Sequence, residues 1–389
     1  MFHNMKQIDR EVLVRRIGVA LRRSRMVALL GPRQCGKSTL ARRIYDARGG
    51  EWFDLERPSA ASMLQNAEPA LEPLRGLVVI DEVQRRPELF PLLRVLADRP
   101  ACPARFLLLG SASPTMIRNA SESLAGRLEL IDMGGFSLSE IGVEHADRLW
   151  LRGGFPLSYL ARNDEASVRW REDFITLFLE RDLANLGLRL SSSVLRRFWM
   201  MIAHSHGQVW NASEIGGSLG ISYMTAKHYL DVLSQAYVIR QVQPWHENIA
   251  KRQVKMPKVY VRDSGLLHAL LGIGNMRALR EHPKVGLSWE GRVVEEVIAA
   301  AGERNTFFWA THSGAELDLL AMRGVARYGF ECKCSVTPDI TRSMRVAQKE
   351  LGLKELLVVH PGPRSYAMDK GIRALSIVDL PDTLSRLFH

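Results

Sequence analysis

The sequence predicts an α/β protein of several domains, and three observations support this class. A short apolar run, residues 26–30, leads through a glycine-rich loop into a helical stretch. Two further apolar runs, residues 77–80 and 106–109, end in polar side chains, which is typical of buried parallel strands. Beyond residue 285, strand-like runs alternate with helical ones. The chain has 389 residues, which is enough for two or three domains that each bury a core.

The net charge of +11 and the pI of about 9.7 suit a polyanionic partner, but charge alone does not identify that partner. No run of about twenty apolar residues occurs, so no helix is expected to span a bilayer. Charged residues interrupt the amino-terminal segment, which is unlike a secretory signal peptide. The cysteines at positions 35, 102, 332 and 334 are too few and too scattered for a disulfide framework. We therefore expect a cytoplasmic protein with reduced thiols and no membrane partner.

The loop "GPRQCGKST" has the residue spacing of a phosphate-binding loop. Its glycines let backbone N–H groups close around the β- and γ-phosphates at a helix N-terminus. Lys37 neutralises the phosphate charge, and Ser38 supplies a hydroxyl ligand for Mg²⁺. The loop therefore predicts a site for ATP and Mg²⁺. The residues of this predicted site are Gly31, Pro32, Arg33, Gln34, Cys35, Gly36, Lys37, Ser38 and Thr39.

Two adjacent acids, Asp81 and Glu82, end the second predicted strand, "LVVIDE". Asp81 is placed to hold Mg²⁺ through its water shell, and Glu82 is placed to orient and polarise the attacking water. The third predicted strand, "RFLLLGSAS", ends where a γ-phosphate would lie. Ser111 is therefore the predicted sensor of that phosphate, and Ser113 is a weaker candidate.

Arg127 lies between a predicted helix and the strand-like run "LELIDM". A planar guanidinium at this place could reach the nucleotide of a neighbouring subunit and stabilise charge on the transferring phosphoryl group. This interpretation predicts a catalytic role for Arg127 and a homo-oligomer, either a ring or a dimer. The alternative interpretation is an ordinary surface salt bridge.

Residues 26 to about 190 resemble the AAA-type ATPases of a prokaryotic group whose carboxyl half is a domain of unknown function (DUF4143). The motifs that carry the resemblance are "GPRQCGKSTL", "VVIDEVQRRPELFPLLR", "LLLGSAS" and "SLAGRLELIDMGGFSLSEI". The later "WLRGGFPLSYL" and "FLERDL" also match this group. The resemblance implies a P-loop ATPase core over residues 1–135 and a helical lid over 136–192. Cys35 departs from the group, which usually has a small aliphatic residue there, and raises the question of thiol sensitivity.

Residues 193–262 predict a winged helix-turn-helix, from the successive segments "VLRRFWMMIAHSHG", "NASEIGGSLGIS" and "YMTAKHYLDVLSQAYVIRQVQPW". The third helix is expected to bury an apolar face that includes Met224 and Leu233, and its start could enter a DNA major groove. Winged helices also serve as protein-interaction or structural modules, so DNA is not the only partner considered. The predicted DNA contacts are Ser222, Tyr223, Thr225, Lys227, Lys251 and Arg252.

Basic residues dominate the end of this segment, as expected for a wing that follows DNA phosphates. Only one acid, Glu247, accompanies them. These basic residues are Arg240, Lys251, Arg252, Lys255, Lys258 and Arg262.

In the predicted terminal domain, residues 263–389, a helix carries Glu290 on the same face as buried residues. Asp318 falls in the second of three following strands. Glu331 and Lys333 fall in the third strand and point to the same side, because side chains alternate along a strand. An acid on the helix, an Asp, and Glu-x-Lys resemble the PD-(D/E)xK restriction-endonuclease-like fold.

The resemblance implies that Asp318 and Glu331 bind Mg²⁺ or Mn²⁺, with Glu290 or Glu296 completing the shell. Lys333 would then orient the water that attacks a phosphodiester, or lower the pKa of that water. The fold does not establish this activity, since unrelated functions share one fold.

We therefore expect an ATP-binding and ATP-hydrolysing protein that binds DNA and processes or remodels it through a nuclease-like terminal domain, whose metal-dependent cleavage the sequence leaves open. One alternative is a nucleotide-operated switch whose terminal domain only binds. Another is a motor on branched or single-stranded DNA, in which Lys333 contacts phosphate instead of supporting cleavage.

Overall fold

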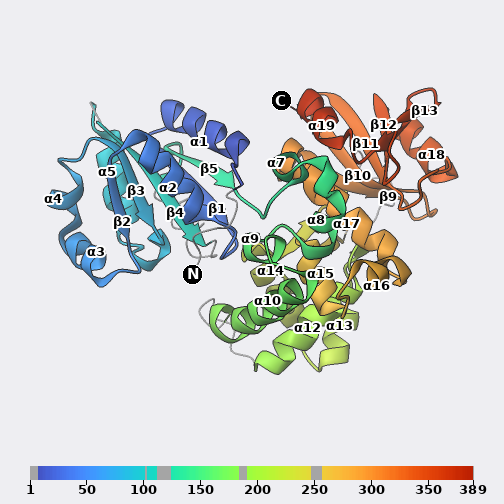
Figure 1. Cartoon of the computed structure of the whole chain (residues 1–389), viewed down its shortest axis with the longest axis horizontal. Helices are drawn as coiled ribbons and strands as arrows, with labels where there is room; N and C mark the ends of the chain where they lie inside the picture. The colour runs from blue at the N-terminus through green and yellow to red at the C-terminus, as the bar shows by residue number, and fades with distance from the viewer. Residues whose placement is uncertain (1–7, 101–102, 112–123, 184–190, 247–255, 389) are drawn as a thin grey trace. The chain divides into compact units, whose positions relative to one another are not determined.

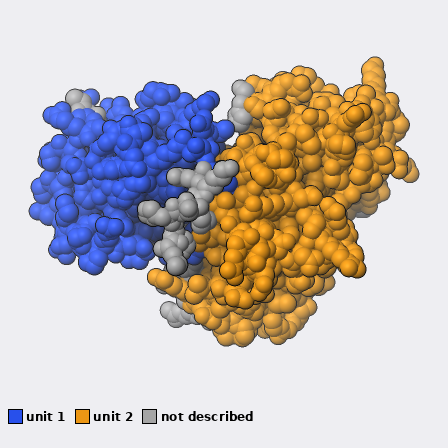
Figure 2. Space-filling model, in the orientation of Figure 1, with its two compact units in different colours: residues 1–136, 235–237 blue, residues 137–234, 238–389 orange. Residues whose placement is uncertain are grey.

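The computed structural model describes residues 8–388 apart from 101–102, 112–123, 184–190 and 247–255. Contacts divide the chain into two compact units (Figure 2). Unit 1 consists of residues 1–136 and 235–237, and unit 2 consists of residues 137–234 and 238–389. The expected boundaries at residues 192 and 262 fall inside unit 2 and stay predictions.

Unit 1 contains a parallel sheet with strand order β2-β3-β4-β1-β5 (Figure 1). Every residue of the first strand is buried, which explains its unbroken apolar sequence. The expected α/β class with a parallel sheet is confirmed. The strands are β1 (Met26–Gly31), β2 (Glu51–Asp54), β3 (Gly76–Asp81), β4 (Ala104–Ser111) and β5 (Leu128–Asp132).

Helices connect and cover these strands. The amphipathic first helix buries Ile17, Ala20 and Leu21, while the fifth buries Phe90 and Leu93 in the main core of the unit. Parallel strands end at a common edge, so the residues that follow β1, β3 and β4 are brought together there. The helices are α1 (Glu11–Arg23), α2 (Lys37–Arg48), α3 (Pro58–Met63), α4 (Ala67–Leu71) and α5 (Leu89–Asp98).

Unit 2 begins with short helices, and the expected lid role of this segment stays a prediction. Arg171, which is fully buried, joins them by donating hydrogen bonds to the backbone oxygens of Leu151 and Gly265. The helices are α7 (Leu138–Ile141), α8 (Ala146–Arg152), α9 (Pro156–Tyr159), α10 (Asp164–Leu177) and the π-helix η4 (Phe178–Asp182).

The next segment has the order helix, strand, helix, helix, strand, strand. Its three short strands form an antiparallel sheet with β8 in the middle. The expected burial of Met224 is wrong, because 69% of this side chain is exposed and the helix buries Ala226, Tyr229 and Leu233 instead. The elements are α12 (Ser192–His204), β6 (Gln208–Val209), α13 (Ala212–Leu219), α14 (Tyr223–Gln235), β7 (Ile239–Val242) and β8 (Lys258–Val261).

The carboxyl-terminal part of unit 2 contains a mixed sheet of order β13-β14-β12-β11-β10-β9. Helices α17 and α19 lie on one side of this sheet, and α18 lies on the other (Figure 1). The expected strands around Asp318 and Glu331 are confirmed, whereas β13 was not expected. The helices are α15 (Ser264–Leu270), α16 (Met276–Glu281), α17 (Val285–Ala301), α18 (Arg342–Glu350) and α19 (Leu380–Phe388). The strands are β9 (Thr306–Ala310), β10 (Glu316–Arg323), β11 (Ala326–Cys332), β12 (Glu355–His360), β13 (Tyr366–Asp369) and β14 (Ile372–Ser376).

Candidate functional site

The glycine-rich loop joins the end of β1 to the start of α2. Gly31 cannot be replaced without displacing backbone, since a Cβ there would lie 2.0 Å from the carbonyl oxygen of Met133. Gly36, directly before α2, has a φ of 96°, a conformation that L side chains rarely adopt. The loop therefore brings its backbone N–H groups to the N-terminus of α2, where an anion is favoured.

Lys37 is folded back over this loop. Its ammonium donates hydrogen bonds to the carbonyl oxygens of Gly31, at 3.0 Å, and Pro32, at 2.7 Å. The side chain is buried, while Ser38 and Thr39 on the first turn of α2 are exposed. The ammonium is thus held at the loop, where it can exchange carbonyl partners for phosphate oxygens.

Asp81 ends β3 and forms a hydrogen bond with the hydroxyl of Ser38. Burial raises the pKa of Asp81 above its usual value, although the hydrogen bond from Ser38 acts in the opposite direction. The structure thus brings together the two residues that the sequence predicts as Mg²⁺ ligands in unit 1.

Glu82 follows directly and has a left-handed backbone, with a φ of 55°. Its N–H donates to Asp81 Oδ1 at 3.0 Å, and its carboxylate accepts from the amide of Gln84. Ser111 ends β4 and pairs in register with Gly31, so its backbone lies at the same edge of the sheet. Ser113 lies outside the described residues.

Arg10 is a buried residue of this site that sequence reasoning missed. Its guanidinium donates to the carbonyl oxygens of Cys35 at 3.3 Å, Gly134 at 3.2 Å and Gly135 at 2.8 Å. It therefore links the start of α1 to the phosphate loop and to the segment after β5. One arginine ahead of an amphipathic helix gives no motif by which it could have been found.

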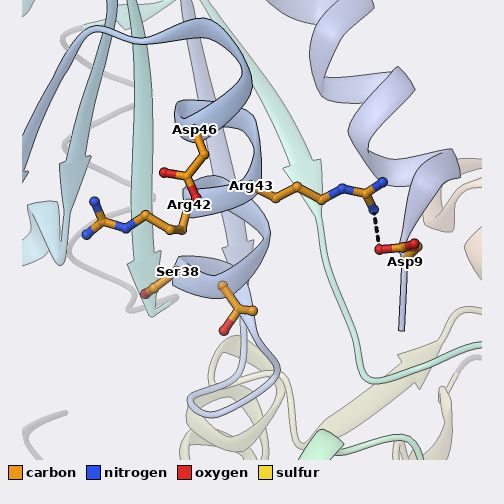
Figure 3. A pocket seen from close by; sticks show the side chains of 6 residues that line it. Asp9, Ser38, Arg42, Arg43 and Asp46 are labelled. Atoms are coloured by element: carbon orange, nitrogen blue, oxygen red, sulfur yellow. Dashed lines mark ion pairs between the residues drawn. The ribbon is translucent and has the colours of Figure 1, made fainter. Parts of the chain in front are cut away.

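A pocket of about 610 Å³ lies along α2 beside the phosphate loop (Figure 3). In this view Arg43 points toward Asp9, with which it forms an ion pair of 2.9 Å, while Arg42 points to the other side of the helix. The guanidinium of Arg42 lies 3.9 Å from the ring centre of Trp52, a cation–π contact. The residues that line the pocket are Asp9, Ser38, Thr39, Arg42, Arg43 and Asp46.

Cys35 is fully buried, with its thiol 3.6 Å from the carbonyl oxygen of Met133. A thiol reagent has no access to it in this conformation, which argues against thiol sensitivity at this position. Arg127 forms an ion pair with Asp98 of its own unit. The structure thus places Arg127 in the surface salt bridge that was the alternative to a catalytic role, and the catalytic role stays a prediction.

The predicted DNA-contacting residues of α14 lie at its start. Tyr223 and Lys227 are exposed. Ser222 instead caps the helix, because its hydroxyl accepts from the N–H of Thr225 at 3.1 Å and shares a hydrogen bond with the Thr225 hydroxyl. Lys251 and Arg252 lie outside the described residues.

The prediction that six basic residues form a DNA-binding wing is wrong for three of them, because these three form ion pairs with carboxylates of unit 2. Arg240 pairs with Glu295 of α17 and, at 2.9 Å, with Glu303. Arg262 also pairs with Glu295, at 3.3 Å, and Lys258 is buried among other acids. Burial of Arg240 and Lys258, and the ion pair of the part-buried Arg262, remove these side chains from a phosphate-binding surface. Lys255, like Lys251 and Arg252, is not among the described residues.

The predicted acids of the terminal domain do converge. Antiparallel pairing of β10 with β11 sets Leu319 against Phe330, which brings Asp318 opposite Glu331. Glu290 reaches this place from α17, and all three carboxylates are buried. Glu296 does not join them, since it accepts a hydrogen bond of 2.8 Å from the N–H of Leu138.

Lys258 of β8 lies among these acids and was not predicted there. Its ammonium is 3.6 Å from Glu290 Oε1, 3.8 Å from Asp318 Oδ1 and 3.9 Å from Glu316 Oε1. We define Lys258, Glu290, Glu316, Asp318 and Glu331 as the carboxylate cluster. The sequence signal for it was the alternation of Lys258 and Tyr260 with apolar residues in a strand, which points both polar side chains to one side.

The other contacts of the cluster are hydrogen bonds. Tyr260 donates its hydroxyl to Glu290 Oε1 at 2.6 Å, and the N–H of Cys332 donates to Asp318 Oδ2 at 2.8 Å. Lys333 donates to Glu331 Oε1 at 2.7 Å, so Glu331 and Lys333 do share a side, as expected. Glu331 Oε2 is buried and has no hydrogen-bond partner in the described part of the chain.

Burial and mutual repulsion raise the pKa values of these acids. The pKa of Glu290 is raised to about 8, first by burial and then by the carboxylate of Asp318, and the pKa of Glu331 is raised to about 7 for the same reasons. Burial alone would lower the pKa of Lys258, but the surrounding carboxylates outweigh it and raise that pKa. The lysine is therefore charged at neutral pH.

Among the residues that the structure describes, no group of three or more His, Cys, Asp or Glu side chains is arranged to hold a metal ion. The acids of the carboxylate cluster are close, but an ammonium lies between them. Likewise, no described helix combines the length and the apolar character needed to cross a membrane.

Protein-family models cover most of the chain. An AAA domain matches residues 23–142, a domain of unknown function (DUF8612) matches 143–277, and a second domain of unknown function (DUF4143) matches 285–380. The expected AAA-type P-loop ATPase domain and DUF4143 domain are confirmed.

Two mycobacterial proteins are similar over nearly the whole chain. They are "Uncharacterized protein Mb2031c" of Mycobacterium bovis and "Uncharacterized protein Rv2008c" of Mycobacterium tuberculosis. Each is 48% identical over 368 residues, which cover 95% of this chain and 83% of the relative. This chain belongs to their family.

The family fold also occurs in a solved structure, the Walker-type ATPase PABY2304 of Pyrococcus abyssi. The TM-score is 0.50 at 19% identity, over 68% of this chain and 96% of that one. At this identity the likeness is one of fold. It supports the P-loop ATPase architecture. Substrates and partners have to be inferred from the residues of this chain, because one fold serves many functions.

Proposed function

We propose that this family member binds and hydrolyses ATP, and that it uses the nucleotide to act on DNA. The observation that carries the ATPase part is the meeting of Lys37, the Ser38–Asp81 hydrogen bond and Glu82 at one edge of the parallel sheet. These are the groups that phosphoryl transfer to water requires: a phosphate-binding ammonium, a hydroxyl and a carboxylate for the metal, and a second carboxylate for water.

Each residue has a separate role in this proposal. Lys37 and the loop N–H groups bind the phosphates, and Glu82 orients the attacking water and accepts its proton. Mg²⁺ would be held by Ser38 and Asp81 and would neutralise charge on the phosphates. Arg10 fixes the loop by binding the carbonyl oxygen of Cys35.

The nucleoside part of ATP fits the pocket beside the loop. Thr39, next to the phosphate loop, lines this pocket together with Arg43 and Asp9. Its volume, about 610 Å³, is in the range of small-molecule sites. The charged Asp9 and Arg43 side chains supply an acceptor and a donor for the polar edges of ribose and base.

DNA binding is supported by the segment from α12 to β8. Its order of elements is that of a winged helix, and α14 presents Tyr223 and Lys227 to solvent at its start. Replacing Lys227 by Ala is expected to weaken DNA binding by several-fold and to lower the slope of log K against log salt by about 0.9, the loss of one phosphate contact. Lys349→Ala, an exposed lysine of α18, is the matched control.

The experiment that tests the proposal is ATP turnover with and without linear, single-stranded and four-way-junction DNA. We expect turnover that at least one of these DNAs stimulates. If no ATP is hydrolysed under any condition, the ATPase part is wrong. If ATP is hydrolysed at a rate that no DNA changes, the second candidate function, a nucleotide-operated switch for another partner, replaces DNA processing. That candidate is favoured by the burial of Arg240 and Lys258 and by the ion pair of Arg262 with Glu295, which leave fewer cations for phosphates.

A further inference from the structure

We propose that Lys258 is the built-in cation of the carboxylate cluster: its ammonium takes the place of a divalent ion, so the terminal domain binds its partner without metal-dependent cleavage. The acids that the restriction-endonuclease-like resemblance predicts as metal ligands are present and close to each other. They do not fit a metal ion, because a positive charge of the chain itself already lies between them.

The distances support this replacement. A divalent ion binds oxygen at about 2.0 to 2.6 Å. The Lys258 ammonium lies within 3.6 to 3.9 Å of carboxylate oxygens from Glu290, Asp318 and Glu316, so an ion bound to the same oxygens would be only a few ångströms from it. Repulsion between two cations at that separation in a buried site strongly disfavours uptake of the ion.

The fold holds the ammonium in position. Lys258 is the first residue of β8, the middle strand of its sheet, and pairs with Val209 on one side and Val242 on the other. The side chain is 5% exposed, and its ammonium also lies 5.8 Å from the ring centre of Phe308. Moving it to water would leave buried carboxylates without their countercharge, which is strongly unfavourable.

The hydrogen bonds of the cluster also hold its side chains in position. Tyr260, two residues along β8, donates to the Glu290 oxygen that also faces Lys258. The second oxygen of Asp318 accepts the N–H of Cys332. Strand β8 thus provides both an ammonium and a hydroxyl to acids of α17 and β10, and the cluster joins these elements as a structural centre.

One carboxylate oxygen of the cluster has no hydrogen-bond partner among the described residues, and it would be available to a metal ion if Lys258 were absent. Glu331 is 5% exposed, and its Oε2 is buried without a hydrogen-bond partner among the described residues. Without the Lys258 ammonium, this oxygen and the oxygens of Asp318 and Glu290 that face Lys258 would form an acidic site whose remaining cation, Lys333, pairs with the other oxygen of Glu331. Carboxylate oxygens are the ligands that Mg²⁺ and Mn²⁺ prefer.

The test is a Mn²⁺ titration of the whole chain without nucleotide. The electron paramagnetic resonance signal of free Mn²⁺ measures how much of the ion remains unbound. Because no ATP is present, the outcome does not depend on the function proposed for the phosphate loop. The variants are Asp318→Asn, Lys258→Met, Lys258→Arg and the double variant of Lys258→Met with Asp318→Asn. Methionine keeps the length of the side chain and removes its charge, whereas arginine keeps the charge.

We expect wild type, Lys258→Arg and Asp318→Asn to bind Mn²⁺ alike. Lys258→Met gains one ion per chain, and Asp318→Asn in the double variant removes it. Loss of Mn²⁺ binding in Asp318→Asn relative to wild type would overturn the proposal, as would a folded Lys258→Met that gains no ion.

If circular dichroism shows that Lys258→Met does not fold, wild type and Asp318→Asn still decide. Equal Mn²⁺ binding by the two supports the proposal, and weaker binding by the variant overturns it. Cleavage of linear DNA with Mn²⁺ is the second measurement on the same pair. Cleavage by wild type that Asp318→Asn abolishes would also overturn the proposal.

Discussion

The guanidinium of Arg127 forms a two-point ion pair with Asp98 at the end of α5, with Nε 2.5 Å from Oδ1 and Nη2 2.9 Å from Oδ2. A third hydrogen bond, of 3.0 Å, joins Nη1 to the carbonyl oxygen of Ala125. Arg127 is thus held by its own unit. To act on the nucleotide of a neighbouring subunit, it would have to leave Asp98.

This arrangement makes a comparison of two variants informative. If Arg127 acts in trans, Arg127→Ala lowers ATP turnover by at least tenfold and keeps nucleotide binding, because only charge in the transition state is lost. Asp98→Ala releases the arginine and is expected to keep or raise turnover. Steady-state phosphate release as a function of protein concentration measures both. An equal loss of ATP turnover in the two variants would show that Arg127 acts only through its ion pair with Asp98 and not on a nucleotide.

Glu82→Gln is expected to separate binding from hydrolysis. Glutamine keeps the shape of the side chain but cannot accept a proton, so turnover should fall by about 100-fold or more. Affinity for ATP should change little, since Lys37 and the loop bind the phosphates. Phosphate release and binding of a fluorescent ATP analogue are the two measurements. Glu56→Gln, an exposed acid near the same edge of the sheet, is the control. Full turnover in Glu82→Gln would remove Glu82 from the mechanism.

Arg10→Met is expected to weaken nucleotide binding, although Arg10 binds backbone carbonyl oxygens of the loop and not the phosphates. The variant loses charge-assisted hydrogen bonds, one buried and two part-buried, to the carbonyl oxygens of Cys35, Gly134 and Gly135, and each such bond typically contributes about 1.5 to 3 kcal/mol to the free energy of unfolding. ATP affinity and the unfolding midpoint should both fall. Arg15→Met, on the exposed face of α1, is the control. A normal ATP affinity in a destabilised Arg10→Met would show that the loop forms without this link.

His268 is expected to make the stability of the protein decrease in mild acid. Its Nδ1 hydrogen bonds to the carbonyl oxygen of Leu151 at 2.9 Å, where Arg171 also donates, and its Nε2 pairs with the hydroxyl of Ser288 at 2.7 Å. Burial lowers the pKa of His268 to about 3, against 6.5 for a free histidine. Between these values the unfolded chain binds a proton that the folded chain does not, so stability falls as pH falls from 6.5 toward 3.

The slope from this group is at most about 1.4 kcal/mol per pH unit. Urea unfolding of wild type and His268→Gln between pH 7 and pH 4.5 measures it, because glutamine retains a donor and an acceptor and does not titrate in this range. The stability of wild type should fall more steeply toward acid. Parallel curves would contradict a neutral, buried His268.

The phosphate loop could be predicted because phosphate binding requires particular residue types at fixed spacing. Asp81 and Glu82 could be predicted because they follow a parallel strand, and parallel strands end at one edge of the sheet. Strand periodicity placed Glu331 and Lys333 on one side, and the resemblance to the PD-(D/E)xK fold singled out these two residues together with Asp318. Lys258 could not be placed, because its partners Glu290 and Asp318 are at least 32 residues away in the sequence, and net charge does not distinguish a buried cation from a surface one. The same reason led to the error on Arg240. Arg10 was missed because its partners are backbone oxygens, which leave no signal in side-chain patterns.

The most direct test of the account is steady-state ATP hydrolysis by wild type and Lys37→Ala, at equal concentration and with Mg²⁺. Lys37 donates hydrogen bonds only to loop carbonyls among the contacts described for it, at 2.7 and 3.0 Å, so the variant should remain folded while losing its phosphate ligand. We predict that wild type hydrolyses ATP and that Lys37→Ala loses tight ATP binding together with turnover. Equal turnover in the two proteins would contradict the assignment of the loop at Gly31 as the site of ATP hydrolysis.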